Sequence, residues 1–235
     1  MMTSVDVYKS AMSKGLKDFF EKYESSLKEL VNCLDTDGLL SRDFTEEKVT
    51  RLINLAKSCN MSLKLSNDFN SIVVLDEVKR KENLTYLKKA FRTEDEIRME
   101  EHCLSALVNS YTTILEKLKI YFLFFIDWSK LNKRNKDIYG LGGAIKELLN
   151  KYPDNLYLNY FNAGTRNSFT HYTFFFGEKS KIILCSEIFD KNPKEMPLHE
   201  LMKEIQNLGV LTEGFYLSVK DKLGMPEINL EMLER

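Results

Sequence analysis

The fold is decided by residues 104–128, which read LSALVNSYTTILEKLKIYFLFFIDW. The large apolar residues in this stretch alternate between four- and three-residue steps, and they are Leu104, Val108, Tyr111, Leu115, Leu118, Phe122 and Phe125. This heptad spacing puts them on one helical face, so it predicts a long helix that packs lengthwise against other helices. A capping box at residues 93–96, with its acidic side chains, marks the expected start of that helix.

Two further long helices are predicted, one near each end of the chain. Residues 5–34 carry apolar side chains at three- or four-residue steps, and Gly38 stands where a glycine ends a helix. Pro197 is expected to open the last long helix. The apolar side of that helix is predicted to comprise Leu201, Ile205, Leu208, Leu211, Phe215 and Val219.

The intervening residues predict shorter elements. A helix is expected after Asp43 or Thr45. Another is expected at about 84–91, while the rest of 60–92 fits either strand or helix. A short helix is expected at 144–151, after a glycine turn. A helix over 154–171 with Leu156 among its inward residues, followed by a hairpin of 172–176 and 181–185, completes the pattern. The expected fold class is all-α: a helical bundle with extra N-terminal helices and a small β-hairpin. Residues 1–92 form either a separate subdomain or additional helices of the 93–235 bundle.

Composition limits the function. The 235 residues include 34 basic and 35 acidic side chains, for a net charge of −1, which argues against binding nucleic acid by bulk charge. The four cysteines are far apart in sequence, and Pro197 separates Glu195 from His199, so we expect no metal site and no cofactor. The longest apolar run, residues 120–126, is too short for a bilayer, which needs about 20 residues. We expect a cytoplasmic protein with reduced thiols and no membrane contact.

One short segment carries residues suited to phosphate chemistry. Arg166, Asn167 and His171 would share one polar arc of a helix. The Arg166 guanidinium can hold two phosphoryl oxygens, and the His171 imidazole can move a proton near neutral pH. The competing interpretation is that both are cations at a helix end, where they bind carbonyl or carboxylate groups.

This segment resembles the Arg-polar-x-x-x-His signature of the HEPN domains (higher eukaryotes and prokaryotes nucleotide-binding). The resemblance covers about residues 93–223 and implies a four-helix core. It further implies a metal-independent endoribonuclease with catalytic residues Arg166, Asn167 and His171, in which the RNA 2′-hydroxyl attacks the neighbouring phosphate. Asn162, one turn earlier, is a candidate for the upstream polar residue that many HEPN proteins carry.

The resemblance also implies partners. In that family the motifs of two protomers usually meet, so we expect a homodimer with the motif at its interface. Aromatic area for this interface is expected from Tyr157, Tyr160, Phe161 and Phe169. RNA is the expected substrate, and a toxin or phage-defence role would add an antitoxin protein. The alternatives are a non-catalytic HEPN-like module that binds RNA, a nucleotide or a protein, and a purely structural helical protein.

Weaker signals surround the motif. Lys130, Lys133, Arg134 and Lys136 would either track an RNA backbone or form a solvated loop, which is the commoner role of such clusters. The alternate aromatics of the expected hairpin, Phe174 among them, would stack bases or, more commonly, pack in the core. The glycines at 140–143 lack the Gly-Lys-Ser/Thr of a phosphate-binding loop.

Overall fold

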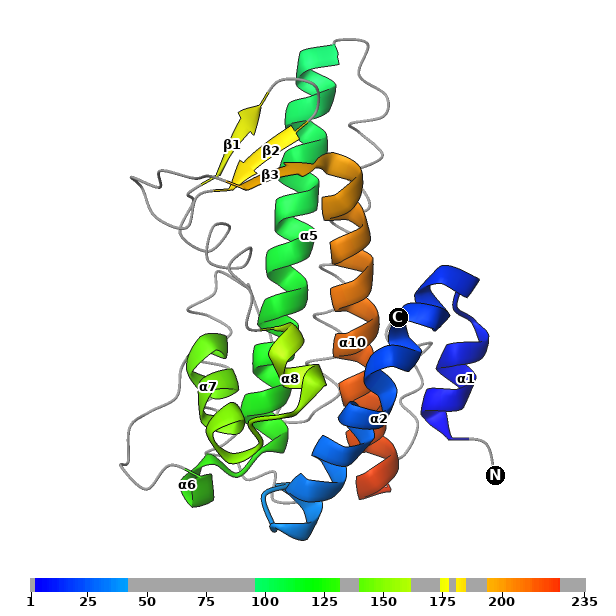
Figure 1. Ribbon diagram of the computed structural model, residues 1–235, viewed down its shortest axis with the longest axis vertical. Helices are drawn as coiled ribbons and strands as arrows, with labels where there is room; N and C mark the ends of the chain where they lie inside the picture. Colours follow the sequence, from blue (N-terminus) through cyan, green and yellow to red (C-terminus); the bar gives the residue numbers. More distant parts are fainter. Residues whose placement is uncertain are drawn as a thin grey trace, which may run out of the picture.

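The computed structural model describes residues 3–41, 96–131, 140–161, 174–177, 181–184 and 194–224. These residues are predominantly helical (Figure 1). The helices are α1 (Ser4–Ser10), α2 (Lys14–Thr36), α5 (Glu96–Phe125), α6 (Trp128–Leu131), α7 (Leu141–Lys151), α8 (Leu156–Tyr160) and α10 (Leu198–Leu223). The strands are β1 (Phe174–Gly177), β2 (Lys181–Leu184) and β3 (Lys194–Pro197).

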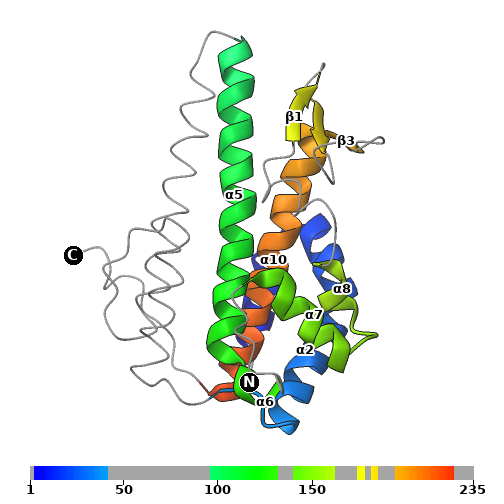
Figure 2. The same cartoon turned by 90° about the vertical axis from the view of Figure 1, so that its left-hand side faces the viewer.

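The helix predicted from residues 104–128 is present as α5, which packs along α10 (Figure 2). The two helices run in the same direction, because Lys117 pairs with Glu213 and, one turn further along both, Tyr121 stacks on Tyr216 at 5.2 Å between ring centroids. The heptad prediction is confirmed for its described side chains, since all are buried: Val108, Tyr111, Leu115, Leu118, Phe122 and Phe125.

Helix α2 packs on another side of α10, again in the same direction. Phe20 and Leu27 lie against Gly214, while further along the pair Lys222 donates a hydrogen bond to Asn32. Glycine at position 214 lets the two backbones approach, because a side chain there would meet the Phe20 ring. The N-terminal residues therefore share one hydrophobic core with α5 and α10.

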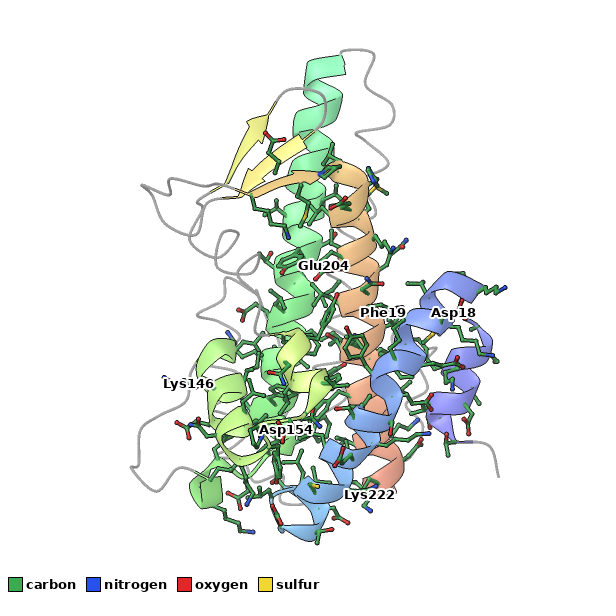
Figure 3. All side chains as sticks on the ribbon, in the orientation of Figure 1. Asp18, Phe19, Lys146, Asp154, Glu204 and Lys222 are labelled. Atoms are coloured by element: carbon green, nitrogen blue, oxygen red, sulfur yellow. The ribbon has the colours of Figure 1, made fainter. Side chains whose placement is uncertain are left out.

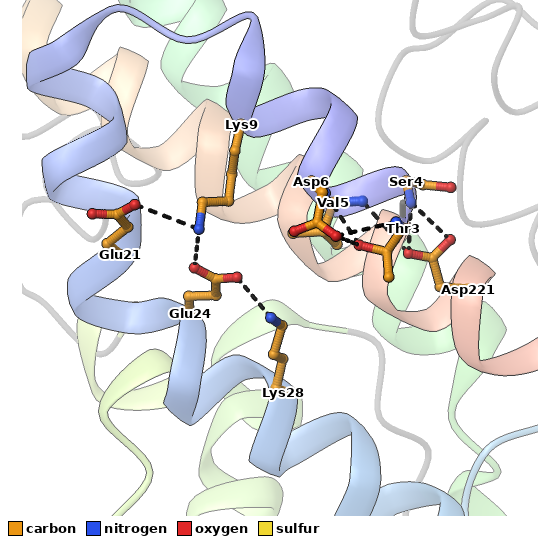
Figure 4. Close-up of polar contacts among 9 residues, drawn as sticks. All are labelled: Thr3, Ser4, Val5, Asp6, Lys9, Glu21, Glu24, Lys28 and Asp221. Atoms are coloured by element: carbon orange, nitrogen blue, oxygen red, sulfur yellow. Dashed lines mark hydrogen bonds and ion pairs between the residues drawn. The ribbon is translucent and has the colours of Figure 1, made fainter. Parts of the chain in front are cut away.

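The prediction of one helix over 5–34 is wrong, because the chain turns between α1 and α2. Ser13 is the N-cap of α2 and has extended backbone angles, so the helix restarts there. Lys9 then contacts Glu24 at 2.6 Å and Glu21 at 3.5 Å (Figure 4). In a continuous helix, Lys9 and Glu24 would be separated by about 22 Å, so α1 has folded back along α2.

The other end of α1 is held by α10. The Asp221 carboxylate accepts hydrogen bonds from the backbone N–H groups of Ser4, at 3.0 Å, and Val5, at 3.5 Å (Figure 4). These are N–H groups that a helix cannot satisfy internally, so a residue from the far end of the chain supplements the Thr3 cap of α1. Val5, which is 3% exposed, fixes the same turn to the core.

The predicted last helix is confirmed as α10. Pro197 is its N-cap, and Gly224 ends it in the left-handed conformation with φ 64°. Gly38 likewise follows α2 with φ 65°, in the place where the sequence predicted a terminating glycine. The predicted apolar side of α10 is buried, with Ile205 partly so.

The strands form an antiparallel sheet in the order β1-β2-β3. β1 overlaps the predicted strand 172–176 and ends one residue beyond it, β2 lies within the predicted strand 181–185, and β3 was not predicted. β3 leads directly into α10, so the sheet lies at the N-terminal end of α10 (Figure 1). The short helix expected at 144–151 begins earlier, at Leu141, so two of the glycines predicted to form a turn are helical.

Several predictions concern residues outside the described ranges. They are the helix after Asp43 or Thr45, the helix at about 84–91, the rest of 60–92 and the boundary at 92/93. In the described part of the chain, no helix combines the length and apolar character needed to cross a membrane.

Candidate functional site

The predicted catalytic residues lie in the segment 162–173, outside the described residues. This applies to Arg166, Asn167 and His171, and to Asn162. Lys133, Arg134 and Lys136 lie in 132–139, also outside them. The structure does describe Lys130 and α8, the helix that leads into the motif segment, and these define the surroundings of the site.

Lys130, predicted as the first residue of a basic loop, lies instead in helix α6 and contacts its own chain. Its ammonium donates a hydrogen bond to the Gly38 carbonyl at 2.8 Å and lies 3.4 Å from the Asp127 carboxylate. Partial burial opposes ionisation of Asp127, but hydrogen bonds from Ser129 and Lys130 hold the pKa of that carboxyl below its usual value. Lys130 therefore ties the end of α5 to the end of α2, while its side chain stays 57% exposed.

Helix α8 brings the chain to the motif. Asn155 caps it by accepting a hydrogen bond from the Leu158 N–H, and the Asn155 side chain also donates to the Ser26 carbonyl of α2. Tyr157 is fully buried, and its hydroxyl donates to the Leu211 carbonyl of α10 at 3.2 Å. These bonds attach α8 to both α2 and α10.

The predicted helix over 154–171 is wrong in its extent. α8 begins at Leu156 and ends at Tyr160, with Phe161 as its C-cap. The residues before Asn155 do not join the helix, because Asn155 has an extended backbone and its side-chain hydrogen bond caps the first turn of α8. Leu156, expected to face inward, is 59% exposed.

The last residue of α8 forms a polar contact with α10. The Tyr160 hydroxyl donates a hydrogen bond to Glu204 at 2.8 Å, and both side chains are half-buried. Burial raises the pKa of Tyr160, and the Glu204 carboxylate raises it further, with Asn207 acting in the opposite direction. The phenol therefore remains protonated and keeps donating to Glu204 across the neutral range.

Aromatic packing fixes the Tyr160 ring. Its centroid lies 5.5 Å from that of Phe19 and 5.2 Å from that of Tyr23, both at steep interplanar angles that suit edge-to-face contact (Figure 3 labels Phe19 and Glu204). Burial and the nearby Glu204 also raise the pKa of Tyr23. Three aromatic rings and one carboxylate thus meet where α8 ends.

Asn207 lies one turn after Glu204 on α10 and is 7% exposed. Among the described residues, no group donates a hydrogen bond to its Oδ1 atom. A buried acceptor without a donor costs about 1–3 kcal/mol, so this position is unfavourable for stability. Such groups in native structures call for a functional or solvent-based explanation.

Two of the aromatic residues expected at a dimer interface are buried in the core of their own chain. Tyr157 is 0% exposed and Phe161 is 3% exposed, so this part of the prediction is wrong. Both rings pack in their own chain, with centroids 5.1 Å apart. Tyr160 keeps partial exposure, and Phe169 lies outside the described ranges.

The structure also describes the glycine turn and the pair Glu195 and His199, which were considered from the sequence as phosphate and metal sites. Gly140 is the N-cap of α7, with no side chain to bond the helix N–H groups. Glu195 lies on β3 and His199 in the first turn of α10. Across the parts of the chain that the structure describes, no group of three or more His, Cys, Asp or Glu side chains could hold a metal ion.

Sequence reasoning missed the contact between Tyr160 and Glu204. The two residues are 44 positions apart, and neither belongs to a motif. The sequence predicted a role only for the aromatic ring of Tyr160, as area for a dimer interface, and nothing in the sequence indicated a hydrogen bond from its hydroxyl.

The described architecture defines a predominantly helical protein with a small antiparallel sheet, and a tyrosine–carboxylate contact at the entry to its motif segment. Comparison with protein-family models, curated proteins and solved structures found no match.

Proposed function

We propose that this protein is a metal-independent endoribonuclease of HEPN type. The observation that carries the proposal is the spacing of Arg166, Asn167 and His171 in a chain whose described part is a bundle of long helices. Within that bundle, α8 is bonded to both α2 and α10 and ends two residues before Asn162. This arrangement supplies a rigid point from which the motif segment starts.

The proposed reaction uses only groups of the protein and the RNA. The 2′-oxygen bonds to the adjacent phosphorus, and the bond from phosphorus to the 5′-oxygen of the next nucleotide breaks. His171 moves the proton lost by the 2′-hydroxyl or gained by the leaving 5′-oxygen. Arg166 stabilises the charge on the phosphorane, and Asn167 orients the histidine or the phosphate. The products are a 2′,3′-cyclic phosphate and a 5′-hydroxyl.

The proposal includes a homodimer with the motif at its interface. One protomer offers one arginine and one histidine at the motif, whereas a twofold axis would supply two of each to one site. Tyr157 and Phe161 are excluded from the interface by their burial, so the contact must use other surfaces. Such a ribonuclease, acting on RNA in its own cell, suits a toxin or phage-defence role with an antitoxin partner.

Cleavage of RNA in the presence of EDTA tests the activity. We expect the wild-type protein to cut RNA with chelator present, and His171→Ala and Arg166→Ala to lose cleavage by about 100-fold or more, as removal of acid–base or charge-stabilising groups commonly does. His199→Ala is the matched control, because His199 is an exposed histidine at the start of α10, and it should cleave normally.

Two outcomes would contradict the proposal. Cleavage abolished by EDTA would indicate metal-dependent chemistry, and RNA that is bound but recovered intact would favour the non-catalytic binding module. The dimer is tested by sedimentation equilibrium and by mixing Arg166→Ala with His171→Ala protomers. We expect a dimer whose mixture regains cleavage; a strict monomer that cleaves RNA would contradict the shared site.

A further inference from the structure

The end of α8 combines features that a purely structural contact does not need. Tyr160, the last residue of the helix, donates to Glu204 of α10 at 2.8 Å and packs against Phe19 and Tyr23 of α2. Its ring therefore links three helices at one point. The chain leaves α8 there, and Asn162 follows two residues later.

Two side chains at this contact, Glu204 and Asn207, can accept more hydrogen bonds than the described residues donate to them. Glu204 is half-buried, and within the described ranges its one hydrogen bond is the one from Tyr160. One turn away, Asn207 is buried with an Oδ1 atom that no described group satisfies. Apolar side chains would pack this junction with less loss of stability, so the presence of both polar groups points to a role other than stability.

We propose that Tyr160, Glu204 and Asn207 form a positioning cluster that fixes where the motif segment 162–171 begins, an inference that rests on the proposed ribonuclease function. Arg166 is six residues from Tyr160, a path of between about 9 Å in a helix and about 20 Å in an extended chain. Over so few residues, the position of Tyr160 limits where Arg166 can lie. Misplacement of a catalytic group by about 1 Å can cost a large part of the rate.

The chain offers a matched control for removal of the Tyr160 hydroxyl. Tyr152 donates a hydrogen bond of the same length, 2.8 Å, to Asp37, is likewise half-buried and lies before α8. Tyr160→Phe and Tyr152→Phe therefore both delete a phenol hydroxyl that donates to a carboxylate, although Asp37 is exposed and also pairs with Lys151. We expect similar melting temperatures for the two variants, but only Tyr160→Phe and Glu204→Gln should lower kcat for RNA cleavage, by about tenfold with KM unchanged.

Asn207→Leu separates positioning from stability. At similar volume it removes both the unpartnered oxygen and the amide group that bonds to Tyr160, so the melting temperature should change little, while kcat should fall. Wild-type cleavage by both Tyr160→Phe and Asn207→Leu would overturn the proposal. An equal loss of kcat in Tyr160→Phe and Tyr152→Phe would also overturn it.

A measurement that needs no ribonuclease activity distinguishes failure of this inference from failure of the proposed function. The chain has three histidines, so the imidazole Cε1–H signals can be assigned by single substitutions and followed by NMR against pH. We expect the His171 signal to shift in Tyr160→Phe and not in Tyr152→Phe. An unchanged His171 signal in Tyr160→Phe would overturn the positioning cluster even if the wild-type protein cleaves RNA. Absence of cleavage in wild type, with the His171 shift present, would overturn only the ribonuclease.

Discussion

The close approach of α2 and α10 at Gly214 predicts opposite effects for two identical substitutions in α10. A Cβ atom at Gly214 would overlap Cε2 of the Phe20 ring and lie 2.8 Å from its Cζ and 3.2 Å from Leu27 Cδ2. Phe20 and Leu27 are both 0% exposed, so neither can move into solvent. At Gly209, the nearest atom would be Ile114 Cδ1 at 3.8 Å, which is an ordinary contact.

The magnitudes follow from helix propensity and overpacking. Alanine in place of a helical glycine stabilises by about 0.5–1 kcal/mol, and Gly209→Ala should show this gain. Gly214→Ala receives the same gain but overpacks the core, which costs about 1–3 kcal/mol. We therefore expect Gly214→Ala to be less stable than Gly209→Ala by about 1–3 kcal/mol, equivalent to roughly 2–12 °C in melting temperature for a chain of this size.

Urea unfolding followed by circular dichroism measures the difference, and a double variant tests its cause. In a Phe20→Leu background the smaller side chain leaves room for the new methyl group, so the penalty at position 214 should largely disappear. Equal stability of Gly209→Ala and Gly214→Ala would refute the close packing of α2 on α10. A penalty at 214 that persists in the Phe20→Leu background would refute the assigned cause.

Two further predictions concern the attachment of α1. Asp221→Ala should lower the free energy of unfolding by about 1 kcal/mol, because the exposed N–H groups at the start of α1 lose the carboxylate that accepts their hydrogen bonds. An increase in hydrogen exchange confined to α1 would confirm this, and unchanged exchange would contradict it. Partial burial opposes ionisation of Glu24, but hydrogen bonds from Lys28 and Lys9 lower the net pKa of that carboxyl below 4.5. The stability that ionised Glu24 adds is therefore present above pH about 4.5 and is lost as the pH falls through the lowered pKa of this carboxyl. Glu24→Gln should therefore lose less stability between pH 5 and 3 than wild type does.

The long helices could be predicted from the sequence because their signal is local and repeated. The heptad steps of α5 and the apolar side of α10 each recur over several turns, and Gly38 and Gly224 occupy left-handed positions that suit glycine. Such patterns specify burial without knowledge of the partner helix. The parallel arrangement of α2, α5 and α10 was not predictable, since it depends on which faces meet.

The errors arose where the apolar spacing continues through a break. Tyr8, Met12 and Leu16 keep helical steps, yet the chain turns between them so that Lys9 can reach Glu24. The early end of α8 has a similar origin, because apolar residues continue past Tyr160 although the helix does not. The contact of Tyr160 with Glu204 joins distant positions, which periodicity cannot detect.

Cleavage of an RNA oligonucleotide that carries a single 2′-deoxy substitution tests the central claim most directly. The cleavage position is first mapped on the unmodified oligonucleotide in EDTA, and the substitution is then placed on the nucleotide whose 2′-hydroxyl would attack. We predict that cleavage at that bond disappears, and that the unmodified substrate yields a 2′,3′-cyclic phosphate and a 5′-hydroxyl in wild type but not in His171→Ala. Cleavage that persists at the 2′-deoxy position, or products that carry a 5′-phosphate, would contradict the account.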